Sequence, residues 1–237
     1  MKTETSSPSQ KFADSVLALR PRIAVFDCDG TLWSGDSGAD FFYWQIDRGM
    51  FPRDVAERAA ARYADYKQGK VDEDTMCGEM VTINAGHALQ ALEEAAEVFF
   101  SSMVEKRIFP EMLRLTRELA SIGCEVWAVS STNDWVVGEG VKRFGILRRR
   151  VLAACVYIED GRATDRLIRV PSGPGKAAAI AEVVQKPVDV CFGNSIHDLA
   201  MLEVARHAFA VNPNPDLEKI ATEKSWQIYW PSGARNH

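Results

Sequence analysis

The 237-residue sequence has few of the residues that build disulfide frameworks or zinc sites. It contains five cysteines and four histidines, and no two cysteines form a Cys-x-x-Cys pair. An odd number of widely spaced cysteines excludes a disulfide scaffold, and the missing pairs argue against structural zinc. Four of the cysteines stand in apolar runs. We therefore expect buried free thiols in a reducing compartment, most simply the cytoplasm.

The sequence also lacks a surplus of positive charge and any long apolar run. Its 28 Lys and Arg residues are outnumbered by 33 Asp and Glu residues, which gives a net charge of −5. This balance gives no reason to expect nucleic acid or an anionic membrane as a partner. No run approaches the ~18 apolar residues of a membrane span, and Ser15–Leu19 is too short for the core of a signal peptide. A small-molecule partner is the simpler expectation.

Short apolar runs alternate with helical patterns along most of the chain. Runs rich in β-branched and aromatic residues predict buried parallel strands at 23–26, 125–129, 188–192, 208–211 and 226–230. Apolar spacing typical of helices occurs at 110–122, 133–144, 175–185, 197–205 and 216–223. Strands that alternate with helices indicate an α/β fold with a doubly wound parallel sheet.

Residues 37–107 interrupt this alternation. They contain no convincing strand, and helical spacing recurs at 41–48, 52–66, 73–83 and 88–104. We therefore expect a helical cap domain at 37–107, inserted into an α/β core domain formed by residues 1–36 and 108–237. Farther along, residues 151–158 and 162–168 flank Asp160-Gly161, which predicts a β-hairpin with a type I′ turn.

Polar side chains follow three of the predicted strands at their carboxyl ends. In chain order they are Asp27, Asp29, Ser130, Ser131, Asn194 and Asp198. Ligands of parallel sheets bind beyond the carboxyl ends of the strands, so we expect these groups in one crevice. Lys176, which follows Gly173-Pro174-Gly175, would add a positive charge there.

One motif among these residues is specific. The stretch after the first strand reads Asp27-Cys28-Asp29-Gly30-Thr31-Leu32, and it resembles the first motif of the haloacid dehalogenase-like phosphatase superfamily. The later blocks occur in that family's order: Ser130, then Lys176, then Gly193 to Asp198. The resemblance covers nearly the whole chain. The helical insertion matches the family's first cap position, and the hairpin and the C-terminal part resemble its phosphoserine phosphatase-like branch.

The resemblance implies a phosphomonoesterase that works through an acyl phosphate. Asp27 would be the nucleophile that attacks phosphorus, and Asp29 would serve as general acid and then as general base. Ser130, with Ser131 beside it, and Lys176 would bind the phosphoryl oxygens.

The resemblance also implies Mg²⁺, held by Asp27, the main-chain carbonyl of Asp29 and position 194, with Asp198 acting directly or through water. In phosphoserine phosphatases an acid nine residues after the nucleophile contacts the substrate's ammonium group, and Asp36 has that spacing. A small, amino-bearing phosphate ester is therefore the expected substrate.

Several of these residues also fit simpler structural explanations. Asp36 could be an ordinary loop acid, Lys176 a solvated lysine, and Ser130 and Ser131 the cap of the next helix. The pattern Ser195-x-x-Asp198 matches a helix capping box. The aromatic residues 41–44 could line a pocket for a quaternary ammonium, although packing inside the cap is the simpler expectation.

Asn194 departs from the family pattern, which usually has Asp at this position. An amide oxygen can coordinate a cation, but it brings no charge. This departure leaves two further functions open beside the phosphatase: a non-catalytic module that binds a phosphate ligand or a protein, and a phosphomutase.

Overall fold

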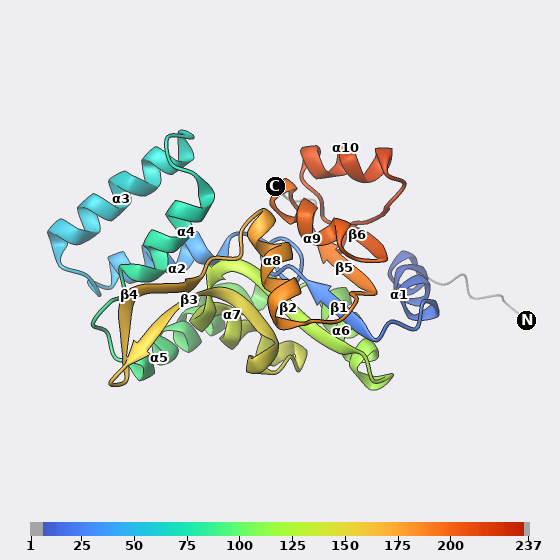
Figure 1. The fold of residues 1–237 in the computed structure, drawn as a ribbon, viewed down its shortest axis with the longest axis horizontal. Helices are drawn as coiled ribbons and strands as arrows, with labels where there is room; N and C mark the ends of the chain where they lie inside the picture. The colour runs from blue at the N-terminus through green and yellow to red at the C-terminus, as the bar shows by residue number, and fades with distance from the viewer. Residues whose placement is uncertain (1–6, 235–237) are drawn as a thin grey trace, which may run out of the picture.

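A seven-stranded sheet organises the structure, a computed structural model that describes residues 7–234. The strand order is β4-β3-β2-β1-β5-β6-β7 (Figure 1). All neighbouring strands are parallel except β3 and β4, which form an antiparallel hairpin. The strands are β1 (Ile23–Phe26), β2 (Glu125–Asn133), β3 (Val151–Glu159), β4 (Arg162–Arg169), β5 (Val190–Gly193), β6 (His207–Val211) and β7 (Gln227–Tyr229). The predicted α/β fold is confirmed.

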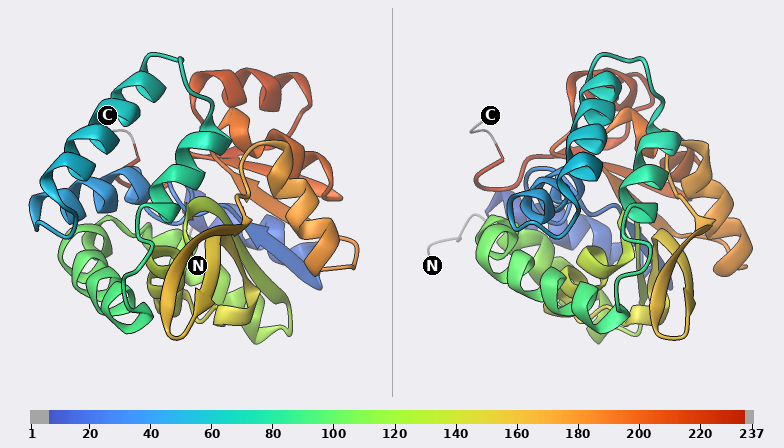
Figure 2. Two further views of the ribbon diagram at one scale, coloured as in Figure 1. Left: turned by 60° about the vertical axis from the view of Figure 1, so that its left-hand side comes forward. Right: turned by 90° about the vertical axis from the view of Figure 1, so that its left-hand side faces the viewer.

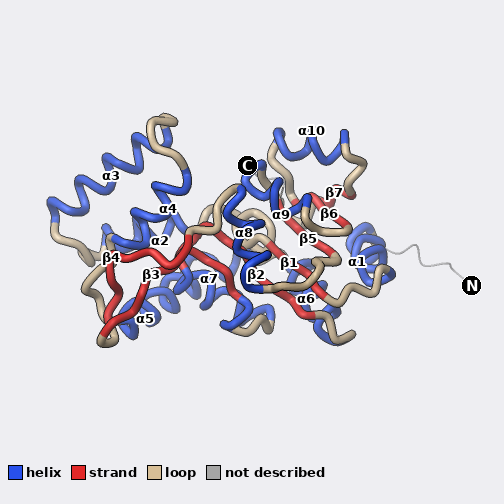
Figure 3. Tube along the Cα trace, viewed as in Figure 1, coloured by secondary structure: helices blue, strands red, loops and turns tan. Residues whose placement is uncertain are grey.

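Helices cover both faces of the sheet (Figure 3). They are α1 (Pro8–Ala18), α2 (Ser37–Asp47), α3 (Arg53–Lys67), α4 (Glu73–Thr82), α5 (Leu89–Phe99), α6 (Pro110–Ser121), α7 (Asp134–Val141), α8 (Pro174–Val183), α9 (Leu199–Glu203) and α10 (Pro215–Glu223). Successive strand residues point to opposite faces. Ala24 and Phe26 of β1 therefore pack with α1, α5, α6 and α7, whereas Ile23 and Val25 pack with α8, α9 and α10. The sheet is doubly wound.

Helix α1 is an element that the sequence did not lead us to expect. The oxygen of Ser7 accepts a hydrogen bond from the backbone N–H of Gln10, and Pro8 occupies the first turn, as is typical of a helix start. The ring of Phe12 stacks on Tyr229 with 4.1 Å between centroids. The apolar face of α1 is short and lies among polar residues, which hid its periodicity.

Four helices, α2 to α5, lie between β1 and β2, as the apolar spacing predicted. Helices α3 and α4 are joined by a loop at the top of both views in Figure 2, and with α2 they enclose a small cluster that includes Phe42, Tyr63 and Met76. Helix α5, in contrast, contributes Leu92 and Phe99 to the main core. The limits of a separate cap at 37–107 stay a prediction.

The β3–β4 hairpin contacts α4. Its turn residues Asp160 and Gly161 have φ values of +49° and +73°, as a type I′ turn requires, so this prediction is confirmed. A Cβ atom on Gly78 of α4 would lie 3.1 Å from Leu167 of β4, which means that glycine allows the two elements to approach closely. The hairpin thereby fixes α4 beside the carboxyl end of β2.

No helix in residues 7–234 combines the length and the apolar character that crossing a membrane requires.

Candidate active site

The first motif places a buried carboxylate directly after β1. Asp27 is 4% exposed, and its backbone N–H donates to the carbonyl of Phe192 on β5 at 2.9 Å. The hydroxyl of Thr31 donates to Asp27 Oδ2 at 2.9 Å. Between them Gly30 has φ +79°, a conformation that favours glycine. The Asp-x-Asp-Gly-Thr stretch therefore turns the chain sharply and holds Asp27 with Thr31, a residue to which our sequence analysis gave no role.

Lys176 links two carboxylates that come from different parts of the chain. Its Nζ lies 2.7 Å from Asp27 Oδ1 and 2.5 Å from Asp198 Oδ1, and the lysine is 3% exposed. The simpler explanation of Lys176 as a solvated surface residue is therefore wrong. A protonated lysine between two carboxylates leaves the cluster one negative charge in excess.

Burial and mutual repulsion shape the titration of this cluster. Burial, then the charge of Asp198, raises the pKa of Asp27, and the contact with Lys176 opposes this rise. Burial alone would lower the pKa of Lys176, but the charges of Asp198 and Asp27 raise it above its ordinary value. The lysine is thus held protonated, and Asp27 is a carboxylate with incomplete charge compensation.

Asp198 is fixed on all sides. Its Oδ2 accepts hydrogen bonds from the backbone N–H groups of Asn194 and Ser195 at 2.8 and 3.0 Å. These contacts form the expected capping box at the 3₁₀ turn Ile196–Asp198, labelled η5. The residue is completely buried, and both of its oxygens have protein donors. Its part in metal binding stays a prediction, while its structural part in orienting Lys176 and Asn194 is evident.

Asp29 is held by donors from three directions. Its Oδ1 accepts from Trp33 Nε1 and from the backbone N–H of Ser37, each at 2.7 Å. Its Oδ2 accepts from the hydroxyl of Thr132 at 2.7 Å. The contact of Trp33 forms within the turn itself, whereas that of Thr132 depends on β2 lying beside β1 and had no signal in the sequence. Thr132 lines the crevice, so Oδ2 is the Asp29 oxygen at which we expect proton exchange with a substrate.

Strand β2 runs farther than predicted and carries both serines. It continues to Asn133, and its pairing with β3 shifts register between Ser130 and Asn133. Asn133 caps α7 by accepting from the N–H of Val136 at 3.0 Å, so the idea that Ser130 or Ser131 caps this helix is wrong. Ser130 is buried, and its oxygen accepts from the N–H of Thr132 at 3.1 Å. At this irregular strand end the hydroxyl of Thr132 donates to Asp29 and that of Ser131 to Glu73. The binding of phosphate by Ser130 and Ser131 stays a prediction.

Asn194 follows β5 and meets the turn after β1. A Cβ atom on Gly30 would lie 1.9 Å from Asn194 Nδ2 and 3.2 Å from its Oδ1, so glycine creates the space that this amide fills. The backbone carbonyl of Asn194 accepts from the N–H of Asn214 at 2.7 Å. The side chain of Asn194 therefore lies against Gly30. Gly30 belongs to the turn after β1 that also carries Asp27 and Asp29.

The donor atoms at this turn fit a hard divalent cation. No group of three or more His, Cys, Asp and Glu side chains within residues 7–234 is arranged to hold a metal. The candidate ligands are instead a carboxylate from Asp27, the backbone carbonyl of Asp29 and the amide oxygen of Asn194. All three are oxygen donors, which Mg²⁺ prefers, and the excess negative charge of the cluster favours a cation. Their assignment as ligands stays a prediction.

Asp36 is the N-cap of α2 and lies at the same crevice. Its side chain accepts from the backbone N–H of Ala39 at 2.9 Å and caps the helix, so it is not a free loop acid. Crowding by protein atoms, then the charge of Asp29, raises the pKa of Asp36, although its contact with solvent limits this rise. Asp36 lines a cavity of about 60 Å³ together with Ser131 and Thr132. Capping and substrate binding are compatible here.

The aromatic run after Asp36 serves packing. Phe41 and Phe42 are buried, and the ring of Trp44 lies 5.8 Å from that of Phe41. Tyr43 is 41% exposed and packs edge-on against Tyr63 at 5.5 Å. None of residues 41–44 is among the residues that line the cavity beside Asp36, so core packing is the better explanation.

Glu73 is a further residue near the site that the sequence did not indicate. It begins α4, yet its carboxylate contacts His197 Nδ1 and accepts from the hydroxyl of Ser131 at 3.4 Å. The hydrogen bond that His197 donates to Glu73 raises the pKa of His197. A helical pattern alone does not reveal that the first residue of an inserted helix reaches the end of β2 and the turn after β5. Glu73 connects α4 to the ends of β2 and β5.

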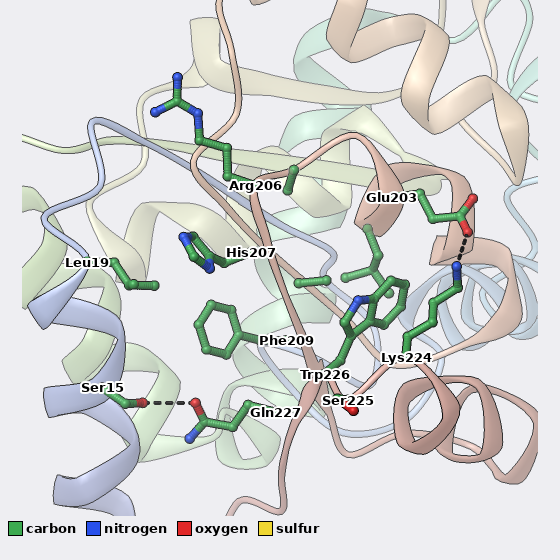
Figure 4. Close-up of a pocket in the computed structure, with 13 residues that line it drawn as sticks. Ser15, Leu19, Glu203, Arg206, His207, Phe209, Lys224, Ser225, Trp226 and Gln227 are labelled. Carbon is green, nitrogen blue, oxygen red and sulfur yellow. Dashed lines mark hydrogen bonds and ion pairs between the residues drawn. The ribbon is translucent and has the colours of Figure 1, made fainter.

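A larger open groove, of about 760 Å³, lies beside β6 and β7 (Figure 4). His207 and Gln227, which begin β6 and β7, line it. Its polar groups largely pair with each other: Ser15 with Gln227 at 3.0 Å, and Lys224 with Glu203 at 2.9 Å. This groove is at the amino ends of the strands and does not contact the carboxylate cluster.

Comparison with known proteins agrees with this geometry. The family model described as haloacid dehalogenase-like hydrolase matches residues 24–203. This chain belongs to that family. The matched region runs from β1 to the end of α9 and includes Asp27, Lys176 and Asp198. The protein is therefore a haloacid dehalogenase-like hydrolase.

Relatives of this hydrolase include named phosphatases. A histidinol-phosphatase from Neisseria meningitidis is 29% identical over 219 residues, which are 87% of this chain and 97% of that protein. A phosphoserine phosphatase from Mycobacterium tuberculosis is 25% identical over 215 residues, 86% of this chain and 69% of that protein.

Solved structures share the fold. A protein of unknown function from Bordetella pertussis has a TM-score of 0.77 at 23% identity and covers 88% of this chain and 97% of its own. A substrate-bound phosphoserine phosphatase has a TM-score of 0.59 at 18% identity, covering 88% and 92%. At these identities the structures establish the α/β fold of the hydrolase.

Proposed function

We propose that this hydrolase is a Mg²⁺-dependent phosphomonoesterase that acts on a small, amino-bearing phosphate ester through an aspartyl phosphate on Asp27. The observation that carries the proposal is the buried contact of Lys176 with Asp27 and Asp198 at 2.7 and 2.5 Å. This contact orients one oxygen of Asp27 and fixes the carboxylate at the end of β1. A carboxylate held in this way at a strand end is suited to attack a phosphorus atom.

The first step transfers the phosphoryl group to the protein. An oxygen of Asp27 forms a bond to phosphorus while the bond from phosphorus to the ester oxygen breaks. Asp29 gives a proton to that leaving oxygen, after exchanging its contact with Thr132 for one with the substrate. Lys176 and the hydroxyls of Ser130 and Ser131 bind the phosphoryl oxygens.

The second step releases phosphate. Water attacks phosphorus, Asp29 accepts a proton from that water, and the bond between phosphorus and Asp27 breaks. When bound, Mg²⁺ would neutralise charge between the phosphoryl group and Asp27, held by Asp27, the carbonyl of Asp29 and the amide of Asn194. Asp198 supports this arrangement by holding Lys176 and the backbone at Asn194.

The proposed substrates are small because α2, α3 and α4 stand over the crevice and exclude bulky groups and bulk water. Asp36 lies beside Ser131 and Thr132 on this crevice and would pair with the amino group of the substrate. Phosphoserine, histidinol phosphate and phosphocholine all fit this description. The names of the relatives, a histidinol-phosphatase and a phosphoserine phosphatase, favour amino-bearing esters.

The test is phosphate release from a panel of such esters by the purified protein, with Mg²⁺ and with a chelator. We expect release from at least one amino-bearing ester and its loss on chelation. A protein that binds these esters without releasing phosphate would instead be the non-catalytic module. Transfer of phosphate between two positions of one substrate would indicate a phosphomutase.

A further inference from the structure

The cavity beside Asp36 has an acidic lining, of which the proposed function uses Asp36 but not Glu73. Its lining residues include Asp36, Glu73, Tyr63, Tyr66, Ser131 and Thr132. Two of the residues that line it are carboxylates, and no lysine or arginine is among the described residues that do so. Ser131 and Thr132 also lie at the end of β2, beside Asp29. The cavity is therefore the space into which the alcohol part of a phosphate ester would extend.

Glu73, at the start of α4, lines this cavity together with Asp36, the N-cap of α2. Its side chain is 16% exposed, and Gly78 keeps α4 in close contact with Leu167 of the hairpin, which fixes the position of Glu73. Its carboxylate contacts His197 and, at 3.4 Å, the hydroxyl of Ser131. Ser131 is one of the residues proposed to bind phosphate. A phosphoryl group that recruits this hydroxyl would free an oxygen of Glu73 toward the cavity.

The present volume of the cavity, about 60 Å³, is well below the ~300 Å³ at which pockets for small-molecule ligands begin. The alcohol part of an ester would have to displace a contact in order to enter. The contact with His197 occupies one oxygen of Glu73, and His197 is 49% exposed, so it can turn toward solvent. Glu73 would then exchange His197 for a donor on the substrate.

Resting on the proposed function, we propose that Glu73 is a specificity residue that selects phosphate esters whose alcohol part carries a second nitrogen donor, such as an imidazole ring, and no carboxylate. Asp36 pairs with the ammonium group, and Glu73 accepts from the second donor. A substrate carboxylate would meet two carboxylates and no basic side chain in this lining. Like charges at a shared site repel each other strongly, so phosphoserine is disfavoured.

The experiment compares kcat/KM for four esters in the presence of Mg²⁺. Phosphoethanolamine carries only an ammonium group, phosphoserine adds a carboxylate, histidinol phosphate adds an imidazole, and an aryl phosphate carries none of these. For the parent protein we expect histidinol phosphate to be used best, and phosphoserine to be used about ten-fold or more less well than phosphoethanolamine.

Glu73→Gln removes the charge and keeps the size of the side chain. We expect kcat/KM to fall about 10-fold to 100-fold for histidinol phosphate, to rise for phosphoserine, and to change less than about two-fold for the aryl phosphate. Asp74→Asn is the matched control, because it removes the same charge from the same exposed turn of α4 outside the cavity lining. It should leave the order of the four substrates unchanged.

The outcomes of this experiment separate the role of Glu73 from the proposed phosphatase function. An active parent that uses phosphoserine as well as phosphoethanolamine, or a Glu73→Gln variant that loses all four activities equally, contradicts the role of Glu73 and leaves the phosphatase standing. A parent that releases no phosphate from any ester overturns the proposed function and this inference with it. If Glu73→Gln fails to fold, the preference of the parent between phosphoserine and phosphoethanolamine decides the question.

Discussion

At the scale of single residues, position 194, a proposed metal ligand, departs from the family pattern. Asn194 would supply a neutral oxygen where the family usually has a carboxylate. The cluster of Asp27, Asp198 and Lys176 nevertheless retains one uncompensated negative charge, because the protonated lysine balances only one of the two carboxylates. A divalent cation is therefore still favoured, with fewer charged ligands to hold it.

Replacing Asn194 with Asp tests this interpretation. The substitution is nearly isosteric, so the fit beside Gly30 is kept while a charge is added. We expect the Mg²⁺ concentration for half-maximal phosphate release to fall about ten-fold, a gain of about 1.4 kcal/mol in binding. Without Mg²⁺ the added charge should destabilise the fold, because it lies near two carboxylates. Both effects are measured by titrating Mg²⁺ against activity and against the thermal midpoint.

Asn214→Asp is the control for this substitution, because Asn214 caps α10 and Asp caps a helix equally well. Its metal requirement should equal that of the parent. An unchanged or higher requirement in Asn194→Asp would remove Asn194 from the set of metal ligands.

Asp36 has two roles that one substitution can separate. Asp36→Asn keeps the helix cap, since Asn is as good a cap as Asp, but it removes the charge proposed to pair with an ammonium group. We expect kcat/KM for amino-bearing esters to fall about 30-fold, corresponding to about 2 kcal/mol, with a plain alkyl phosphate little affected. Equal losses for both kinds of ester, measured on one preparation, would show that Asp36 does not recognise the ammonium.

At the scale of elements, the turn between β1 and α2 carries most of the chemistry. Gly30 is required there for two reasons, its φ of +79° and the 1.9 Å that would separate a Cβ from Asn194 Nδ2. The sequence made the turn predictable through Asp-Gly, and the Asp-x-Asp spacing indicated the two carboxylates. It did not indicate that Thr31 and Trp33, each four residues beyond its aspartate, would turn back to donate to it. The contact of Thr132 with Asp29 joins segments 103 residues apart, and such a contact has no local sequence pattern.

Gly30→Ala separates the turn's backbone strain from its contact with Asn194. An L-residue in the left-handed region costs about 1–2 kcal/mol, and the collision with Asn194 adds to this cost. Gly123→Ala carries the strain alone, because Gly123 has φ +84° and no atom within 4 Å of its Cβ position. In urea unfolding we expect both variants to lose stability, Gly30→Ala by more. Phosphate release should fail only in Gly30→Ala; normal activity in that variant would contradict the packing of Asn194 against this turn.

At the scale of the whole molecule, the fold was largely predictable, whereas helix α1 and the contacts of Glu73 were not. The alternation of apolar runs and helical spacing indicated the doubly wound sheet, and the turn residues indicated the hairpin. Helix α1 was missed because its apolar face, with Phe12 and Val16, is short. That face can be recognised only from its packing against β7 and the core. The contacts of Glu73 with Ser131 of β2 and His197 of η5 likewise depend on how α4 packs on the hairpin, and a sequence pattern carries no such information.

The whole arrangement serves one buried carboxylate. Strands β1 and β5 place Asp27 and Asn194 at the carboxyl ends of the parallel strands, α8 brings Lys176, and η5 brings Asp198. Helices from the insertion then cover these strand ends. The central claim is that Asp27 is the nucleophile of a phosphatase.

The most direct measurement is phosphate release by the wild-type protein and by Asp27→Asn, with Mg²⁺ and the same amino-bearing ester. An amide can keep the contacts with Thr31 and Lys176, so the fold should be retained in thermal unfolding, but it cannot form the acyl phosphate. The account predicts that the variant releases less than about 1% of the phosphate that the wild type does. A folded Asp27→Asn protein that keeps more than about 10% of the activity, with a mock purification excluding contaminants, would contradict it.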